Sequence, residues 1–284
     1  MQRIETLNKL RKEGLFQMGK IYLTNKQEQI IIDKYLQGAS QKESGKAVGV
    51  GYKIVQRVLK ENNISIRTQG ESRTLYKVNN DFFKTQTREM AYILGLLGSD
   101  GCVAKNKNVI YIELQRQDRD ILEKINTIIG NERPVQDYTT GRGYENSKMY
   151  FYSKEIKQDL AEYHIIPNKT YETEYRFPEK LKKEFYFDYI RGLFDGDGCI
   201  KTTNPTITWQ IDTSSKDIAE QICSYLQSFD IEAKISILPK TNISIYRIYC
   251  YNKKNCKKLF NLLYHDTNLF LKRKNDKFIE LLNT

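Results

Sequence analysis

The chain has 284 residues, 39% of them hydrophobic and 12% aromatic, which is enough for two or three compact units with packed cores. Its formal charge of +11, from 46 basic and 35 acidic side chains, suits a polyanionic partner, although many soluble proteins are basic too. Five cysteines without a CxxC pair argue against a disulfide framework and a zinc cluster, and two histidines are too few for a zinc hydrolase.

The chain start is polar and carries no apolar signal region. No stretch approaches the ~20 apolar residues that span a bilayer. These features predict a soluble, cytoplasmic protein of a reducing compartment, with no membrane partner. Residues 1–25 show no pattern that predicts an element.

Residues 26–60 predict a small helical unit. Apolar residues at helical spacing indicate a first helix that ends before Ser40, and Ser40 is suited to cap the next one. Residues 41–60 then resemble a helix-turn-helix, in which Gly45 permits a close helix crossing and Gly49 allows the turn. An ordinary helical hairpin would show the same pattern and stays open as the alternative.

The second helix of the helix-turn-helix would expose side chains suited to the bases and phosphates of a major groove: Tyr52, Lys53, Gln56, Arg57 and Lys60. Arg67 and Arg73 follow among polar residues. They predict a basic linker that either lies along a nucleic-acid backbone or is a solvated connector. The expected division is an arm and helix-turn-helix over 1–66 and a linker over 67–86.

The rest of the chain is an internal repeat with an offset of 97 residues, which pairs Gly95 with Gly192 and Asp100 with Asp197. In each half an apolar helix ends at an acidic turn, and alternating strands and amphipathic helices follow. The repeat predicts a pseudo-two-fold pair of halves, 87–180 and 181–284.

The two acidic turns are the candidate chemical centre. A helical glycine costs about 1 kcal/mol relative to alanine, so its occurrence in both helices indicates that the two backbones approach closely. Such packing would bring Asp100 and Asp197 together, where two carboxylates repel unless a cation bridges them. Mg²⁺ prefers oxygen ligands and accepts phosphate oxygens, and phosphodiester cleavage uses this chemistry.

Residues 93–101 and 190–198 resemble the paired motifs of LAGLIDADG homing endonucleases. The second motif matches closely, whereas Gly98 replaces the usual acid at the sixth position of the first. The resemblance covers about residues 88–284. It implies an α+β fold of two pseudo-symmetric αββαββα repeats that form a DNA-binding saddle, beside an N-terminal all-α helix-turn-helix domain.

The resemblance also implies site residues. It assigns one catalytic and metal-binding acid to each half, Asp100 and Asp197, with Mg²⁺ or Mn²⁺ as cofactor. A lysine late in each half polarises water in this family, which implies Lys169 and Lys274, with Lys272 as the alternative to the latter. A polar residue near the end of the second strand often joins them, and the candidates are Gln115 or Arg116, and Asp212 or Thr213.

Two loops, 139–148 and 240–244, are expected to be hairpin tips that extend the DNA contacts, and Arg142 is the candidate contact in the first. Arg116 is a further candidate for DNA binding. The strand tyrosines are expected to pack on one face of the sheets and to leave the other face for DNA: Tyr111, Tyr150, Tyr152, Tyr246, Tyr249 and Tyr251.

The function implied is a monomeric, site-specific double-strand DNA endonuclease that hydrolyses one phosphodiester on each strand and leaves short 3′ overhangs. It would associate with double-stranded DNA, with no protein partner implied, and be intron-borne or free-standing. A regulator of the same fold that binds DNA without cutting it is one alternative, and an intron RNA maturase is another. The helix-turn-helix favours duplex DNA over RNA.

Overall fold

The computed structural model describes residues 23–172, 174–203, 206–239 and 243–283, and the chain divides into two compact units between Leu75 and Tyr76. Residues 1–22, which gave no prediction, lie outside the described residues, as do 240–242 of the second expected hairpin tip. Within the described ranges, no helix combines the length and the apolar character that a bilayer span requires.

The smaller unit consists of short helices around a small core. Its described residues form the helices α2 (Asn25–Leu36), α3 (Gln41–Lys46), α4 (Tyr52–Glu61) and α5 (Gln69–Thr74). Ser40 caps α3 as predicted, because its hydroxyl accepts from the backbone N–H of Glu43 while the Glu43 carboxylate accepts from the N–H of Ser40. Five side chains form the buried core: Ile31, Tyr35, Val55, Val58 and Leu59.

The turn between α3 and α4 depends on two glycines. A Cβ atom at Gly45 would overlap the carbonyl oxygen of Val50 and lie 3.0 Å from the Val55 side chain. Gly49 has a φ of +75°, a conformation that favours glycine. The close crossing and the turn therefore lie where the sequence predicts them.

The segment 67–86, expected to be a linker, contains ordered structure at both ends. The Arg67 guanidinium donates to the carbonyl oxygens of Tyr35 (3.0 Å) and Ala39 (2.5 Å) and lies over the Tyr35 ring. From Tyr76 the chain belongs to the larger unit, and Phe83 is buried in that unit's core. Phe83 therefore does not belong to a linker, because burial of its ring in the core is favoured over its exposure to water.

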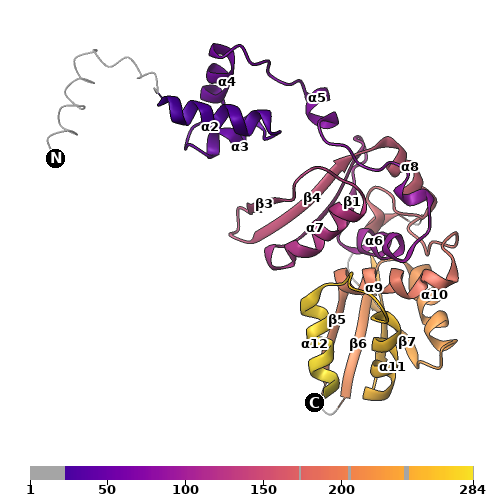
Figure 1. The fold of residues 1–284 in the computed structure, drawn as a ribbon. Helices are drawn as coiled ribbons and strands as arrows, with labels where there is room; N and C mark the ends of the chain where they lie inside the picture. The colour runs from indigo at the N-terminus through magenta and orange to yellow at the C-terminus, as the bar shows by residue number, and fades with distance from the viewer. Residues whose placement is uncertain (1–22, 173, 204–205, 240–242, 284) are drawn as a thin grey trace. The chain divides into compact units, whose positions relative to one another are not determined.

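The larger unit contains two halves of the same topology (Figure 1). The first half runs α6 (Arg88–Ser99), β1 (Gly101–Val103), β2 (Val109–Gln115), α7 (Arg119–Ile128), β3 (Gln136–Thr139), β4 (Glu145–Tyr152) and α8 (Lys154–Glu162). The second runs α9 (Tyr186–Asp197), β5 (Gly198–Thr203), β6 (Thr206–Thr213), α10 (Lys216–Gln227), β7 (Ala233–Pro239), β8 (Ser244–Tyr251) and α11 (Lys253–Leu263), followed by α12 (Lys272–Asn283).

Each half holds one four-stranded antiparallel sheet, in the orders β1-β2-β4-β3 and β5-β6-β8-β7. This confirms the predicted αββαββα order and the α+β class. Four short 3₁₀ helices complete the described secondary structure: η1 (Phe82–Lys84), η2 (Arg116–Asp118), η3 (Lys169–Tyr171) and η4 (Lys183–Phe185). The additional helix α12 was not predicted, and it makes the second half longer than the first.

Each sheet buries one face and leaves the other accessible. In β2, Ile110, Ile112 and Leu114 are buried, and the residues between them are half-buried or exposed. The prediction for the strand tyrosines was wrong for most of them, because they share the accessible face with polar residues: Tyr111, Tyr150, Tyr152, Tyr249 and Tyr251. Tyr246 does pack against the core. Aliphatic side chains fill the covered face instead, together with apolar rings such as Phe151 and Trp209.

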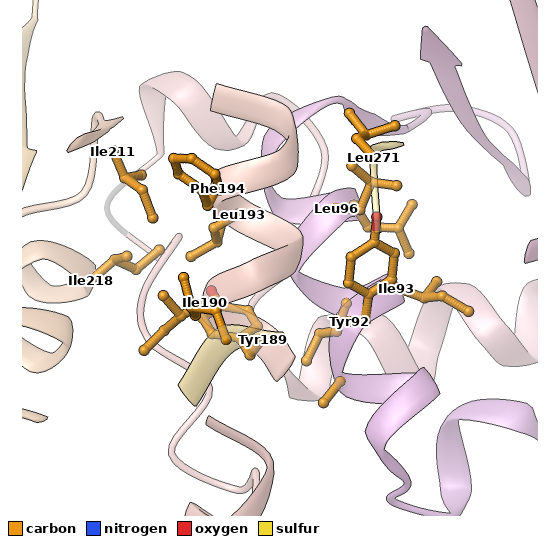
Figure 2. Close-up of a cluster of buried hydrophobic side chains, with 14 of the residues drawn as sticks. Tyr92, Ile93, Leu96, Tyr189, Ile190, Leu193, Phe194, Ile211, Ile218 and Leu271 are labelled. Atoms are coloured by element: carbon orange, nitrogen blue, oxygen red, sulfur yellow. The ribbon is translucent and has the colours of Figure 1, made fainter. Parts of the chain in front are cut away.

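Helices α6 and α9 pack directly against each other in the core between the halves (Figure 2). A Cβ atom at Gly95 would overlap the carbonyl oxygen of Tyr189 and lie 2.9 Å from the nitrogen of Leu193. A Cβ at Gly192 would overlap the carbonyl oxygen of Tyr92 in the same way. This reciprocal contact confirms that both glycines allow the two backbones to meet.

Ion pairs also link the two halves. The buried Asp188 carboxylate accepts from Arg88 of α6 (3.2 Å) and from Arg191 of its own helix (2.8 Å). Arg273 of α12 donates two hydrogen bonds, of 3.0 and 2.8 Å, to Asp118 in the first half. Both carboxylates are buried whereas Arg88 and Arg273 are partly exposed, so the loss of either arginine would leave a buried acid with one ion-pair partner fewer. These contacts link the two halves.

Candidate active site

The two helices of the pair end at the predicted acids. Asp100 caps α6 and donates its backbone N–H to the carbonyl oxygen of Leu96 (3.0 Å), and Asp197 is the last residue of α9. A Cβ atom at Gly196 would overlap the Ser99 hydroxyl and lie 3.0 Å from the Asp100 carboxylate. The helix ends are therefore in contact, and the fold brings the two acids to one place.

The electrostatics of the two acids favour a cation. Burial raises the pKa of Asp100 to about 6, and the negative charge of Asp197 adds to this rise. The pKa of Asp197 is also raised, chiefly because the surrounding protein displaces water from its carboxylate, although the side chain keeps contact with solvent. The negative charge of Asp212 adds to this rise. Lys169 and Lys274 oppose both rises. Two carboxylates held in this way are stabilised by a bound positive charge.

The donor set fits a hard divalent cation. In the described part of the chain, no three His, Cys, Asp or Glu side chains cluster as metal ligands do. A cation here would rely on the carboxylates of Asp100 and Asp197, on backbone oxygens and on water. Mg²⁺ and similar ions bind in this way, because they retain several waters and take few carboxylates, whereas structural zinc uses four Cys or His ligands.

Both predicted lysines reach the helix ends. The Lys169 ammonium donates to the carbonyl oxygen of Gly101, and burial lowers its pKa while Asp197 opposes that change. Lys274, only 8% exposed, donates to the carbonyl oxygens of Phe194, Gly196 and Gly198, and burial lowers its pKa to about 8. The alternative Lys272 is exposed and pairs with Asp276, away from the helix ends.

A pocket of about 440 Å³ opens beside Asp197. Its walls include Gly98, Ser99, Lys169, Tyr175, Asp212 and Thr213. Asp212 forms a two-pronged ion pair with Arg247 on the neighbouring strand, with both hydrogen bonds at 2.7 Å. The strand-end candidates Asp212 and Thr213 thus lie at the site, and Asp212 is the one whose charge acts on Asp197.

The first-half candidates do not line this pocket. Gln115 is exposed and accepts from Gln117 (2.7 Å), and Arg116 pairs with Glu145 (3.2 Å). Arg142 is exposed in the turn between β3 and β4, where Gly143 has a φ of +86°. The first expected hairpin tip is therefore a hairpin turn.

Tyr175 is a site residue that no pattern in the sequence predicts. Its buried hydroxyl donates to the carbonyl oxygen of Gly98 (2.7 Å), and a Cβ at Gly98 would lie 3.0 Å from that hydroxyl. In the second half the corresponding Asp195 instead accepts from the Tyr92 hydroxyl (2.8 Å) and the Leu271 N–H (2.7 Å). Tyr175 lies in an irregular segment without periodicity, so no local pattern marks it. The one indication in the sequence is Gly98 itself, which lacks the acidic side chain usual at that position and leaves room for another group.

The DNA-binding candidates of the smaller unit differ in exposure. Tyr52, Lys53 and Lys60 are exposed on α4. Gln56 is half-buried and donates to Gln41 (2.9 Å), and Arg57 pairs with Glu61 (3.8 Å). Arg67 is engaged by backbone carbonyls and a ring, and the exposed Arg73 lies 3.5 Å from the Gln69 amide oxygen.

The net charge is concentrated in the smaller unit. Residues 1–75 hold 14 of the 46 basic and 7 of the 35 acidic side chains, a net charge of +7 on about a quarter of the chain. Residues 76–284 hold the remaining 32 basic and 28 acidic side chains, a net charge of +4. A polyanion would therefore be attracted most strongly to the smaller unit.

Comparison with protein families gives a match to a LAGLIDADG-like domain over residues 87–164 and 184–263. An uncharacterised protein of Methanocaldococcus jannaschii is 26% identical over 198 residues, which are 64% of this chain and 69% of that protein. The DNA-directed RNA polymerase subunit Rpo1C of the same organism is 26% identical over 155 residues, 54% of this chain and 17% of the subunit.

Two solved structures have lower similarity. The N-terminal LAGLIDADG domain of DUF199/WhiA is 14% identical, with a TM-score of 0.42, over 72% of this chain and 97% of that domain. The I-LtrWI LAGLIDADG homing endonuclease bound to target DNA is 14% identical, with a TM-score of 0.44, over 72% of this chain and 91% of that one. The family match covers more than half of the chain and includes both acidic helix ends.

Proposed function

Because this chain belongs to the LAGLIDADG-like family, with one copy of the domain in each half, we propose that it is a site-specific endonuclease that cuts both strands of duplex DNA. The observation that supports this most directly is the meeting of Asp100 and Asp197 at abutting helix ends, where both carboxyl pKa values are raised and two lysines lie beside them. The products would be duplex ends with short 3′ overhangs.

Asp100 and Asp197 would hold the divalent cation, Mg²⁺ or Mn²⁺. When bound, such an ion supplies an activated water and stabilises the charge that develops on the phosphate oxygens. Lys169 and Lys274 are the proposed basic residues of the two halves, and the pocket beside Asp197 gives a phosphate and a water access to Lys169. The ion pair with Arg247 holds Asp212 on the wall of that pocket.

The accessible sheet faces would bind the DNA around the centre, with Arg116 and Arg142 as outlying contacts. In the smaller unit, Tyr52, Lys53 and Lys60 are exposed on α4, and Gln56 and Arg57 are partly exposed beside them. This helix would add contacts that lengthen the recognised site, as a recognition helix does. Arg73 would contact phosphate, whereas the contacts of Arg67 suit it better to holding the unit together.

The test is cleavage of a randomised duplex library in the presence of Mg²⁺, followed by sequencing of the ends. We expect the native chain to produce double-strand ends at one sequence class with a common 3′ overhang. Asp100→Asn and Asp197→Asn should each abolish cleavage, and Asp230→Asn, which changes an exposed acid on the α10–β7 turn, should not. Cleavage that survives in the double variant would refute the proposed centre.

A DNA-binding regulator that does not cut is the second candidate. The net charge of +7 on residues 1–75 supports it, because binding through the smaller unit does not require the acids. Selection of bound duplexes from the same library separates the two candidates. Enrichment of one sequence without any cut ends, at several Mg²⁺ and Mn²⁺ concentrations, would favour the regulator.

A further inference from the structure

We propose that the two lysines of the centre have different roles: Lys169 is a catalytic lysine, and Lys274 is a positioning residue that fixes the end of α9. The catalytic half of this assignment rests on the proposed nuclease function, whereas the positioning half does not. The family resemblance pairs the two lysines and would give both the same task. Their hydrogen bonds differ, however, and this difference is the basis of the inference.

All three N–H groups of the Lys274 ammonium are occupied. They donate to the carbonyl oxygens of Phe194 (2.7 Å), Gly196 (2.8 Å) and Gly198 (2.8 Å). An ammonium has three donors and no acceptor, so none remains for a water or a phosphate. The carbonyls of Phe194 and Gly196 lie in the last turn of α9, and Gly198 follows the helix directly; the Phe194 oxygen also accepts from the backbone N–H of Gly198. Lys274 therefore acts as a buried cap that holds the helix end, and Asp197 with it, in place.

Lys169 makes fewer contacts. Among the described residues its ammonium donates to one carbonyl oxygen, that of Gly101, which the repeat pairs with Gly198. Its side chain is half-buried and lines the 440 Å³ pocket together with Asp197 and Asp212. Two of its three donors can therefore reach a water or a phosphate oxygen in that pocket.

In the first half a tyrosine hydroxyl, as well as the lysine, donates to a carbonyl oxygen at the helix end. The Tyr175 hydroxyl donates to the carbonyl oxygen of Gly98, in the last turn of α6, and forms part of the same pocket wall. In the second half the repeat pairs Gly98 with Asp195, and the tyrosine hydroxyl found there, that of Tyr92, donates to the Asp195 carboxylate and not to a backbone carbonyl oxygen. Lys274, on the additional helix α12, supplies the donors there instead.

The experiment compares Lys169→Met and Lys274→Met with a matched control, Lys157→Met. The Lys157 ammonium also donates to three carbonyl oxygens, those of Ala104, Lys105 and Lys107 in the β1–β2 loop. Thermal unfolding is measured for each full-length variant. Cleavage of the selected duplex is followed with each strand labelled separately.

We expect Lys169→Met to keep its Tm within about 2 °C of the native chain and to cut one strand at least about 100-fold more slowly, so that nicked duplex accumulates. Lys274→Met should lower the Tm by about 4 °C or more, as Lys157→Met does, and slow both strands together. A Lys274→Met variant with the native Tm that loses the cutting of one strand would overturn the assignment.

A second measurement does not depend on cleavage. The native chain is treated briefly with an amine-acylating reagent, and the modified peptides are quantified by mass spectrometry. Lys169 should react at least about tenfold faster than Lys274, because a buried amine reacts only after local opening. If no duplex is cut but this ratio and the Tm loss of Lys274→Met are found, the nuclease function fails and Lys274 remains a positioning residue. Equal labelling with an unchanged Tm would refute the positioning role.

Discussion

At the scale of single residues, Asp195 shows how the site uses a carboxyl group for hydrogen bonding rather than for charge. One oxygen accepts from Tyr92 and from the Leu271 backbone, and the other has no partner among the described residues. Burial raises its pKa to about 6. The charged form is therefore disfavoured in the folded protein, and the neutral form would make the same contacts at lower cost.

This gives a prediction for Asp195→Asn. Because the folded pKa lies above the ordinary value of 3.8, the native carboxylate destabilises the fold increasingly as the pH rises from about 4 to above 6. An amide keeps the accepting oxygen without the charge, so the variant should gain about 1–3 kcal/mol in free energy of unfolding at pH 7.5. Urea unfolding should show the gain shrinking towards pH 4. A variant less stable than the native chain at pH 7.5 would contradict this account.

A second prediction concerns cation binding. A cation and a proton compete for the same carboxylates, and the pKa of Asp100 is raised to about 6 with that of Asp197 raised as well. The affinity for Mn²⁺ should therefore fall as the pH drops through about 6, and calorimetric titration at several pH values would measure this. Asp100→Asn should remove the dependence together with most of the affinity. Affinity that is unchanged between pH 5 and 7.5 would place the cation elsewhere.

At the scale of the elements, the α6–α9 pair is limited by backbone contact. Gly95→Ala and Gly192→Ala each place a methyl group on a carbonyl oxygen of the other helix. Alanine favours a helix by about 1 kcal/mol, but the overlap forces the helices apart, so we expect a net loss of about 3 kcal/mol or more. The control is Gly141→Ala, where the added atom meets open space. Chemical denaturation that finds no difference between these variants would refute the close approach.

The same elements show how far the sequence alone predicts the structure. The offset of 97 residues predicts the helix pair and both sheets, because short loops conserve the spacing from Gly95 to β3. The offset is 99 at the ends of β4 and β8 and 105 at the two lysines, since the loop before α12 is longer. The repeat offset therefore does not pair the two lysines, and the family resemblance alone does. Helix α12 could not be predicted from the repeat, because the first half has no corresponding helix.

Contacts between segments distant in the chain could not be predicted. Tyr175 reaches Gly98 across 77 residues, and Arg273 reaches Asp118 across 155, with no local pattern that marks either pair. The alternation in the strands defines two faces, but it does not indicate which face the helices cover. For that reason the tyrosines were assigned to the wrong face, although their strands were predicted correctly.

At the scale of the whole molecule, charge and chemistry lie in different units. The smaller unit carries most of the positive excess, and the larger unit carries the acids. We therefore expect the smaller unit to determine much of the affinity for DNA and the larger unit to determine cutting. Affinity that comes from phosphate contacts declines with salt in proportion to the number of contacts.

The corresponding variant is Lys53→Ala with Lys60→Ala on α4. It should weaken DNA binding and lower the slope of log K against log salt by about 2, while the cleavage rate at saturating protein stays native. Lys180→Ala, which removes an exposed lysine paired with Glu162, is the control and should leave the slope unchanged. A native salt slope in the double variant would show that α4 does not lie on the DNA.

The contact between Ser99 and Gly196 has a consequence for ancestry and for engineering. The α6–α9 pairing is self-complementary at its glycines, so a single repeat could in principle form a homodimer. Two copies of the second repeat would set glycine against glycine. Two copies of the first would set Ser99 against Ser99. A Cβ atom at the facing position, which is Gly196 in this chain, would already overlap the Ser99 hydroxyl. The Ser99 side chain therefore disfavours pairing of the first repeat with itself, and the second repeat is the better starting point for a designer who seeks a self-assembling fragment.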